Sequence, residues 1–162
     1  MSKIKPYNNS KSKKEEITIM FDNIAENYDF LNFSLSLGIH NRWRKEAIKK
    51  IQNKPKKILD VATGTGDFAI TAAKYTKAHI TGIDISKGML NIGIKKITQH
   101  KLNERITLQE ADSEDLPFEK NSFDAITAGF GIRNFENLEK GLSEIHRVLD
   151  RNGIVVILEP ST

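Results

Sequence analysis

Cysteine is absent from the 162-residue sequence, and long apolar runs are absent as well. Without cysteine the chain has no disulfide, no thiolate metal site and no cysteine nucleophile, which suits a cytoplasmic protein. The longest unbroken apolar run covers only residues 154–158, far short of a transmembrane span. Lysines are frequent near the N-terminus, but no apolar stretch follows them, so we do not expect a secretory signal.

A strong net charge is also missing, because 25 basic and 21 acidic residues leave only +4. Proteins that bind nucleic acid usually gather basic side chains on one face and add aromatic or base-reading residues. Here basic and acidic residues are mixed, except in the N-terminal tail and in a run between Arg42 and Lys50. We therefore expect no nucleic-acid partner. The two basic segments are best explained as solvated surface, with a weak attraction to an anionic membrane as the alternative.

The N-terminal third of the sequence has a helical pattern. Residues 1–13 are polar and basic, and we predict a disordered tail there. Residues 14–54 are predicted to form a helical extension, or lid, of two helices, the second from about residue 41 to residue 52 and ended by Pro55. The apolar positions at helical spacing are Ile17, Met20, Phe21 and Ile24 in the first helix and Trp43, Ala47, Ile48 and Ile51 in the second.

Residues 55–162 alternate between short apolar strands and helices. We predict strands at 57–61, 80–83, 106–109, 123–128 and 154–158. The predicted helices cover 67–74, a stretch capped by Ser86, and a stretch capped by Asn137. The apolar positions of the last helix are Leu138, Leu142, Ile145 and Leu149, and Asn152 with Gly153 forms a turn before the last strand. This alternation predicts an α/β fold with a doubly wound, mostly parallel, Rossmann-like sheet, which binds ligands at the carboxyl ends of its strands.

A glycine-rich turn, residues 60–67, follows the first predicted strand and begins a helix. Gly64 and Gly66 allow a ligand to approach the backbone closely, and the helix N-terminus presents free N–H groups. Together with Ala69 and with Asp84, about twenty residues further on, the turn also fits the dinucleotide pattern of nicotinamide-dependent oxidoreductases. The turn alone therefore leaves three interpretations: a nucleotide or S-adenosylmethionine (SAM) site, a nicotinamide site, and a structural turn.

Polar residues end the next two predicted strands as well. Asp84 closes the second strand, where a carboxylate can accept hydrogen bonds from both ribose hydroxyls of an adenosine. A helix cap or a surface acid is the alternative role for Asp84. Asp112 and Ser113 follow the third strand, where they would either contact an adenine edge or form a turn.

Several stretches resemble one family. Asp-Val-Ala-Thr-Gly-Thr-Gly-Asp (60–67), Asp-Ile-Ser-Lys-Gly-Met-Leu (84–90), Ala-Asp-Ser-Glu-Asp-Leu-Pro-Phe (111–118) and Asn-Ser-Phe-Asp (121–124) are similar to motifs of Rossmann-fold SAM methyltransferases. Residues 20–32, 129–137 and 147–153 narrow the resemblance to the ubiquinone/menaquinone biosynthesis C-methyltransferases, of the demethylmenaquinone methyltransferase type. The match runs almost without gaps from Lys14 to Glu159, and Phe-Gly-Ile-Arg-Asn (130–134) is its most specific part.

The resemblance implies SAM as cofactor and a prenylated quinol as substrate, methylated on a ring carbon. Demethylmenaquinol is the expected acceptor, and the 2-polyprenyl-benzoquinol of ubiquinone biosynthesis is the alternative. A nicotinamide-dependent oxidoreductase becomes the least favoured interpretation. The residues implied to bind SAM are Thr65 at the methionine end, Asp84 on the ribose, Asp112 and Ser113 beside the adenine, and the backbone of Gly64, Gly66 and Gly129.

The acceptor side is less well defined by the sequence. Our candidates are Tyr28 and Asp29 in the lid-like segment and Arg133 and Asn134 beyond the fourth strand, with Arg133 as a donor to a quinolate. A role in fixing the loop is an equal alternative for Arg133. The four histidines, His40, His79, His100 and His146, show no paired spacing, and no metal site and no catalytic base is identified.

The last predicted strand poses a structural problem. Residues 153–158 have the composition of a strand buried on both faces, yet the resemblance implies two further strands beside it, beyond Thr162. An exposed sheet edge invites pairing with another chain. We expect either a truncated but active enzyme, half of a split enzyme that needs a complementing C-terminal segment or a homo-oligomer, or an inactive SAM-binding remnant. Because a quinol carries a prenyl tail, we also expect transient contact with the inner membrane face.

Overall fold

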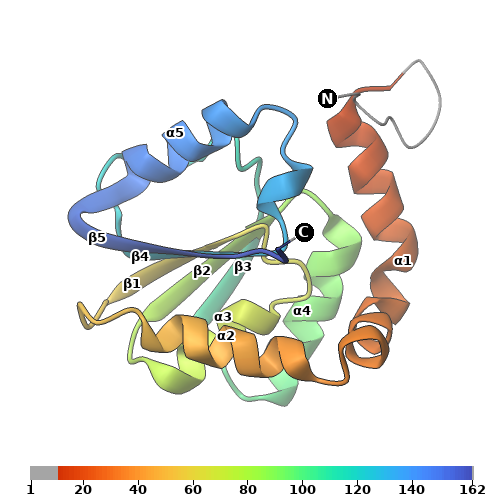
Figure 1. Ribbon diagram of the computed structural model, residues 1–162, viewed down its shortest axis with the longest axis horizontal. Helices are drawn as coiled ribbons and strands as arrows, with labels where there is room; N and C mark the ends of the chain where they lie inside the picture. Colours follow the sequence, from red (N-terminus) through yellow and green to blue (C-terminus); the bar gives the residue numbers. More distant parts are fainter. Residues whose placement is uncertain (1–10, 162) are drawn as a thin grey trace.

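The computed structural model describes residues 11–161 as five helices, a 3-10 turn and five strands (Figure 1). The helices are α1 (Lys13–Ser36), α2 (Ile39–Lys49), α3 (Asp67–Tyr75), α4 (Lys87–Gln99) and α5 (Leu138–Val148), with the 3-10 turn η1 at Ile132–Asn134. The strands are β1 (Lys57–Val61), β2 (His79–Asp84), β3 (Ile106–Glu110), β4 (Phe123–Gly129) and β5 (Leu149–Leu158).

All strand pairs are parallel, and their order in the sheet is β3-β2-β1-β4-β5. The chain moves outward from β1 through β2 to β3, then crosses back to the other side of β1 for β4 and β5. The prediction of a doubly wound parallel sheet is therefore confirmed. The order reverses between β1 and β4, and ligands of such folds bind at the carboxyl ends of the strands beside that point.

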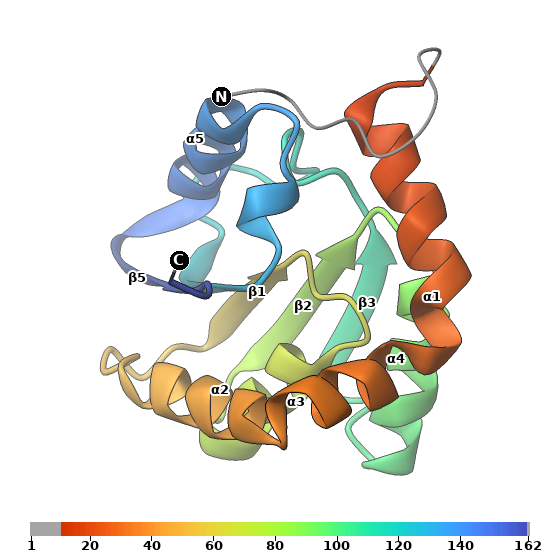
Figure 2. The ribbon, with the colours of Figure 1, turned by 45° about the vertical axis from the view of Figure 1, so that its right-hand side comes forward.

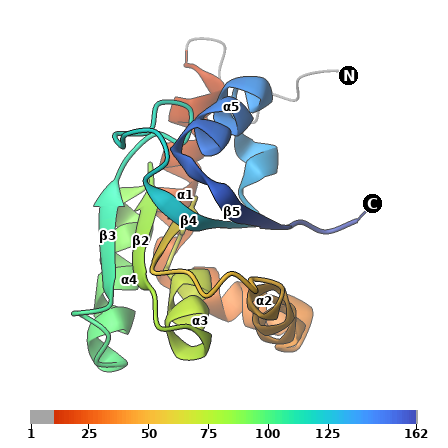
Figure 3. The same ribbon diagram turned by 90° about the vertical axis from the view of Figure 1, so that its left-hand side faces the viewer.

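The two faces of the sheet bury separate apolar cores (Figure 3). Ile58 of β1 faces a core shared with α2, α3 and α4, whereas Leu59 and Val61 face a core shared with α5. The alternation follows from the two-residue period of a strand. Ile48 of α2 belongs to the first core, so the second helix of the predicted lid segment is part of the cover of the sheet.

The long helix α1 lies against α4 and reaches the carboxyl edge of the sheet (Figure 2). Ser12 caps it with a capping box, accepting from Glu15 N while the Glu15 side chain accepts from Ser12 N. The helix thus begins inside the segment 1–13 that the sequence indicated as disordered; residues 1–10 lie outside the described part of the chain. It ends where Leu37 and Gly38 take left-handed conformations, with φ of 50° and 79°.

Two details near the C-terminus differ from the sequence prediction. Asn152 and Gly153 do not form a separate turn: β5 runs from Leu149 through both, and the register shift beside Phe123 and Ala125 absorbs them as an irregularity of the strand. Helix α5 is also rotated from its predicted face. Leu138 and Leu142 are exposed, while Gly141 and Ile145 are buried, because Gly141 packs directly against the ring of Phe135.

Strand β5 lies at one edge of the sheet, and within residues 11–161 nothing pairs with its outer side. The strand is only half-buried, with Ile157 47% exposed. The edge position anticipated for this strand is therefore observed. Among the helices of residues 11–161, none is long and apolar enough to cross a membrane.

Candidate SAM-binding site

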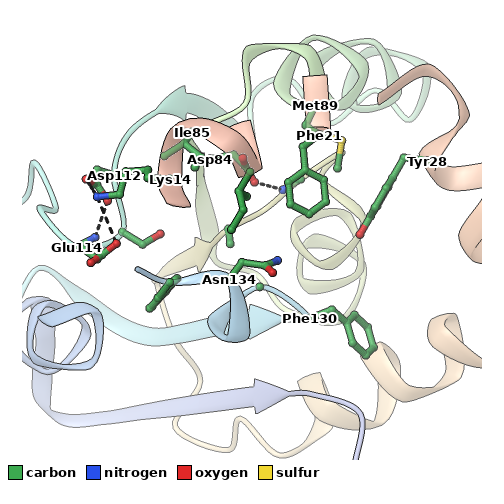
Figure 4. Close-up of a pocket in the computed structure, with 17 residues that line it drawn as sticks. Lys14, Phe21, Tyr28, Asp84, Ile85, Met89, Asp112, Glu114, Phe130 and Asn134 are labelled. Carbon is green, nitrogen blue, oxygen red and sulfur yellow. Dashed lines mark hydrogen bonds and ion pairs between the residues drawn. The ribbon is translucent and has the colours of Figure 1, made fainter. Parts of the chain in front are cut away.

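A pocket lies at the carboxyl ends of β1, β2 and β4 and is covered by α1 (Figure 4). Its lining comes from six parts of the chain: α1, the glycine-rich turn, the end of β2, the start of α4, the loop after β3 and the segment after β4. The pocket is therefore at the point where the strand order reverses, as the fold predicted.

The glycine-rich turn leaves β1 in a left-handed conformation. Ala62, Gly64 and Gly66 have φ values of 53°, 57° and 83°. A Cβ on Gly64 would lie 3.3 Å from the Met89 side chain, so a larger residue would press against α4 as well as adopt a strained φ. Gly64 lines the pocket, whereas Gly66 is the N-cap residue of α3 and is not part of the lining.

Asp84 lies at the end of β2 on the wall of the pocket. Its Oδ2 accepts from Gly64 N at 2.8 Å, and its Oδ1 accepts from Ser86 N at 2.9 Å. Burial raises the pKa of Asp84, and these backbone donors only partly oppose that effect. Each oxygen has accepted one hydrogen bond and keeps capacity for a second, so the carboxylate can receive two hydroxyl donors from a ligand.

Asp112 and Ser113 line the other end of the pocket, where Lys14 of α1 covers them. Lys14 Nζ lies 2.6 Å from Asp112 Oδ2 and 3.3 Å from Glu114 Oε2. Burial raises the pKa of Asp112, but the hydrogen bonds from Lys14 and from Glu114 N outweigh it and leave that pKa below its usual value. Sequence reasoning missed Lys14, because no local signal marks an ion pair between residues that are 98 positions apart.

A narrower extension continues from the pocket beneath the glycine-rich turn, with Gly64, Gly129 and Phe130 lining both. Asp60 lies on its floor and accepts from Thr63 Oγ1 and Thr127 Oγ1, each at 2.6 Å. Complete burial raises the pKa of Asp60 to about 6, despite both hydroxyl donors. The sequence analysis included Asp60 in the glycine-rich stretch 60–67 but predicted no role for it.

Thr65 and Asp29 contact each other at the side of this extension. Thr65 Oγ1 donates to Asp29 Oδ1 at 2.6 Å, and Lys96 Nζ lies 2.7 Å from Asp29 Oδ2. Lys96 also pairs with Asp67 at the start of α3. Asp29 therefore connects α1 to the glycine-rich turn and to α4, and it does not line the main pocket. The hydroxyl of Thr65 donates its hydrogen bond to Asp29.

The structure separates the remaining acceptor-side candidates. Tyr28 and Asn134 line the pocket, together with Phe130. Arg133 is exposed and lies outside the lining. Gly129 lines the pocket, and a Cβ there would lie 2.8 Å from the ring of Phe68. Within residues 11–161 no three acidic or histidine side chains gather in a way that would hold a metal ion.

Solved structures share this architecture. The chain superimposes on the [4+2]-cyclase SpnF with a TM-score of 0.80 at 22% identity, covering 90% of this chain and 60% of that one. It matches a SAM-dependent methyltransferase of Aquifex aeolicus with a TM-score of 0.64 at 23% identity, over 70% of this chain and 62% of that one. A Haemonchus contortus phosphoethanolamine N-methyltransferase, solved with S-adenosylhomocysteine, gives a TM-score of 0.66 at 27% identity, over 72% and 27%. The fold and the site define the Rossmann-like SAM-dependent methyltransferase class.

Within that class the chain belongs to the ubiE/COQ5 methyltransferase family, which matches residues 9–162. A Bacteroides fragilis demethylmenaquinone methyltransferase is 52% identical, over 99% of this chain and 66% of its own length. The Porphyromonas gingivalis demethylmenaquinone methyltransferase is 44% identical, over 98% and 66%. The Citrifermentans bemidjiense ubiquinone/menaquinone biosynthesis C-methyltransferase is 50% identical, over 93% and 65%. The predicted family is confirmed, and the chain spans about two thirds of the length of these relatives.

Proposed function

We propose that the protein transfers the methyl group of SAM to a ring carbon of a prenylated quinol, with demethylmenaquinol as the acceptor. The observation that carries this proposal is the half-buried carboxylate of Asp84, held by the glycine-rich turn on the wall of a pocket at the switch point of the sheet. The names of the relatives supply the acceptor. Those relatives include both demethylmenaquinone and ubiquinone/menaquinone methyltransferases, so the 2-polyprenyl-benzoquinol is the second acceptor to assay.

The residues of the pocket fit SAM. Asp84 has free acceptor capacity for the ribose hydroxyls, and Asp112 with Ser113 provides polar groups for the adenine edge at the other end. The carboxylates of Asp60, which is fully buried, and Asp84, which is half-buried, have no basic side chain in hydrogen-bond contact among the described residues. Such a wall favours a cationic ligand. When bound, SAM supplies a methyl group already activated by its sulfonium.

The chain's own residues then have to orient the acceptor and exclude water. Helix α1 covers the pocket, Tyr28 and Asn134 present polar groups to it, and Phe130 and Phe135 form apolar walls. Asp29 can influence acceptor binding only through its effect on the position of Tyr28, its neighbour in α1. Arg133 remains a candidate donor to the quinolate, approached from the outer side of the pocket.

The unpaired edge of β5 supports a second proposal, that full activity requires a further strand-forming segment beside it, in the same chain, in a complementing segment or in a second copy. The alternative to an active enzyme, a SAM-binding remnant, differs from it in turnover and not in SAM affinity. Assay of this chain alone and together with the third of a relative that the match does not cover would separate the two.

Membrane contact is the third part of the proposal, because a prenylated acceptor resides in a bilayer. The end of α1 and the start of α2 expose several large apolar side chains, of which Leu35 and Leu37 are 84% and 82% exposed. Arg42 of α2 is exposed nearby in sequence. We expect salt-sensitive co-sedimentation with anionic liposomes, reduced by L35D/L37D and unchanged by the control L142D on α5. If neither added salt nor L35D/L37D changed the amount of protein bound to the liposomes, this part of the proposal would be wrong.

The test of the cofactor site is calorimetric titration with SAM, with NADH as the competing ligand class. Asp84→Ala should abolish SAM binding, whereas Glu110→Ala, which removes an exposed acid at the end of the neighbouring β3, should leave it intact. NADH should give no heat. If folded protein binds NADH, or binds SAM equally well without Asp84, the proposed cofactor site is wrong. With SAM binding established, transfer of a labelled methyl group to demethylmenaquinol tests the reaction.

A further inference from the structure

Arg44 of α2 is a cation buried beside the cofactor pocket. It is only 6% exposed and lines the extension beneath the glycine-rich turn. A charged side chain is almost never fully buried unless it is paired. The partners of its guanidinium therefore indicate what this part of the structure binds.

The chain itself provides Arg44 with few partners. Its Nη1 donates to Asn41 Oδ1 at 3.1 Å, while its Nη2 lies 3.6 Å from Asp67 Oδ2, which is longer than a hydrogen bond. Asp67 is in turn paired with Lys96. A guanidinium has five N–H donors, so most of those of Arg44 are unused within residues 11–161. None of its nitrogens is among the enclosed, unpartnered atoms of that part of the chain, so the unused donors border open space.

The guanidinium is held in place from one side. Its Cζ lies 6.0 Å from the centre of the Phe130 ring. Phe130 adopts a backbone conformation that bulky residues rarely take, with φ at 60°, and its N–H donates to Leu158 O at 2.7 Å. Strain of this kind persists where the surrounding structure enforces it, often at a functional site. Arg44 is therefore positioned before a ligand arrives, which lowers the entropic cost of binding.

The extension begins at one end of the cofactor pocket. Figure 4 shows Tyr28 and Phe130 at the end of the pocket opposite Asp112, and both residues also line the extension. With the adenine beside Asp112 and the ribose on Asp84, as in the proposed function, the sulfur-bearing side of the adenosine is directed toward this end. In SAM that side carries the methionine part, which ends in an α-carboxylate and an α-ammonium group.

The charges of the extension are complementary to such a zwitterion. Arg44 provides a positive charge, and Asp60 on the floor of the extension provides a negative one. The start of α3 lines the extension as well, and the first N–H groups of a helix have no partner inside the helix. In the neighbouring hollow that Arg44 also lines, Lys96 already pairs with Asp29. The extension, which joins the cofactor pocket, is therefore the side from which we expect a ligand to reach Arg44.

We infer that Arg44 binds the carboxylate of the methionine part of SAM. The inference rests on the proposed function and identifies the residue that holds the far end of the cofactor. A guanidinium can donate two parallel hydrogen bonds to a carboxylate, which the compact ammonium of a lysine cannot match. With the ribose held by Asp84 and the carboxylate by Arg44, the sulfonium between them keeps a fixed position. Arg44 thus helps to orient the methyl group for transfer.

Two ligands that differ only in the carboxylate test this inference. They are S-adenosylhomocysteine and its decarboxylated analogue, which keeps the adenosine, the sulfur and the ammonium. By calorimetry the parent protein should bind S-adenosylhomocysteine roughly ten to a hundred times more tightly than the analogue, as expected for hydrogen bonds to a charged group. Arg44→Met should lose this difference. The control Arg151→Met, which removes an exposed arginine of β5, should keep it.

Methylthioadenosine, which lacks the whole amino-acid part, shows whether the pocket remains intact in the variants. The parent, Arg44→Met and Arg44→Lys proteins should bind it equally, and Arg44→Lys should keep only part of the preference for the carboxylate. If Arg44→Met does not fold, NMR of the Arg44 Nε–H signal in the parent protein, assigned with Arg44→Lys, tests the same contact. S-Adenosylhomocysteine should shift that signal, and the decarboxylated analogue should not.

The outcomes separate this inference from the proposed function. Failure of the parent protein to bind both SAM and S-adenosylhomocysteine would overturn the proposed function, and this inference with it. Equal affinity of the parent protein for S-adenosylhomocysteine and its decarboxylated analogue would overturn only the inference. A preference for the carboxylate that Arg44→Met retains would assign the carboxylate to another residue and would also overturn it.

Discussion

At the scale of single residues, the site is organised around two carboxylates. Asp60 and Asp84 lie on either side of the glycine-rich turn, and burial raises the pKa of both. Each is held by two donors, hydroxyls for Asp60 and backbone N–H groups for Asp84. Keeping two acids close to one turn costs stability, and such a cost is typical of a site prepared for a positively charged ligand.

Asp60 should therefore make the folded protein less stable as the pH rises. Its pKa is about 6 in the folded protein, against an ordinary value of 3.8. Between these values the folded protein holds a proton that the unfolded chain has released, so stability falls from pH 4 to pH 6 and the full cost, on the order of 3 kcal/mol, is present above pH 6. Asp60→Asn should remove this decrease. Urea unfolding at pH 4.5, 5.5 and 7 measures it.

The control for that measurement is Asp115→Asn, because Asp115 is exposed and outside the pocket. It should follow the pH dependence of the parent protein. An Asp60→Asn protein that loses stability between pH 4.5 and 7 as steeply as the parent would show that Asp60 is not the titrating group.

At the scale of elements, α1 is attached to the rest of the domain by one polar face. Lys14 pairs with Asp112, Asp22 Oδ1 accepts from Ser86 Oγ at 2.6 Å and from Gly88 N at 2.9 Å, and Asp29 accepts from Thr65. Spacings of eight and seven residues place these three side chains on nearly the same side of the helix. Because α1 covers the pocket, we expect these attachments to control the exchange of a ligand bound in it.

Asp22→Ala should loosen the middle of α1 without altering the pocket lining. It removes two hydrogen bonds at the N-terminus of α4, each worth about 1 kcal/mol. We expect hydrogen exchange of the α1 amides to become roughly ten times faster or more, and SAM to associate and dissociate faster. Mass-spectrometric exchange of peptides from residues 13–36 measures the first effect, and stopped-flow kinetics the second.

Glu26→Ala is the matched control, since Glu26 is an exposed acid on the same helix. Its exchange pattern should match that of the parent protein. If Asp22→Ala also leaves the exchange of α1 unchanged, the contact with α4 is not what holds the lid.

The elements show where sequence reasoning succeeds and where it does not. The bounds of β1 were predicted as observed because Ile58, Leu59 and Val61 form a short, mostly apolar stretch that ends just before the glycine-rich turn. Ser86 and Asn137 cap helices as expected, since capping depends on residues three positions apart. Contacts between distant segments leave no such signal. Lys14 on Asp112 and His40 against Phe130 depend on how α1 and α2 pack, which local patterns do not encode.

At the scale of the whole molecule, the domain leaves two kinds of surface uncovered. One is the outer edge of β5, and the other is the apolar surface at the junction of α1 and α2. The edge was predictable, because the family resemblance implies two further strands beside residues 153–158. The apolar junction was not. Trp43 occurs at a helical spacing that equally suits a core, and no predicted helical face included Leu35 or Leu37.

The edge of β5 should govern association of the protein with itself. A half-buried, mostly apolar strand with unpaired backbone groups is a template for another strand, and charged side chains at such an edge oppose pairing. Ile157→Lys should therefore keep the protein monomeric at concentrations at which the parent protein associates. Size-exclusion chromatography with light scattering measures this difference.

The control Ile94→Lys changes an equally exposed isoleucine on α4, 48% against 47% exposed, and should leave association as it is in the parent protein. Equal effects of the two variants would mean that general surface hydrophobicity, not the strand edge, drives association. A parent protein that stays monomeric throughout would mean that the edge is protected without a second copy.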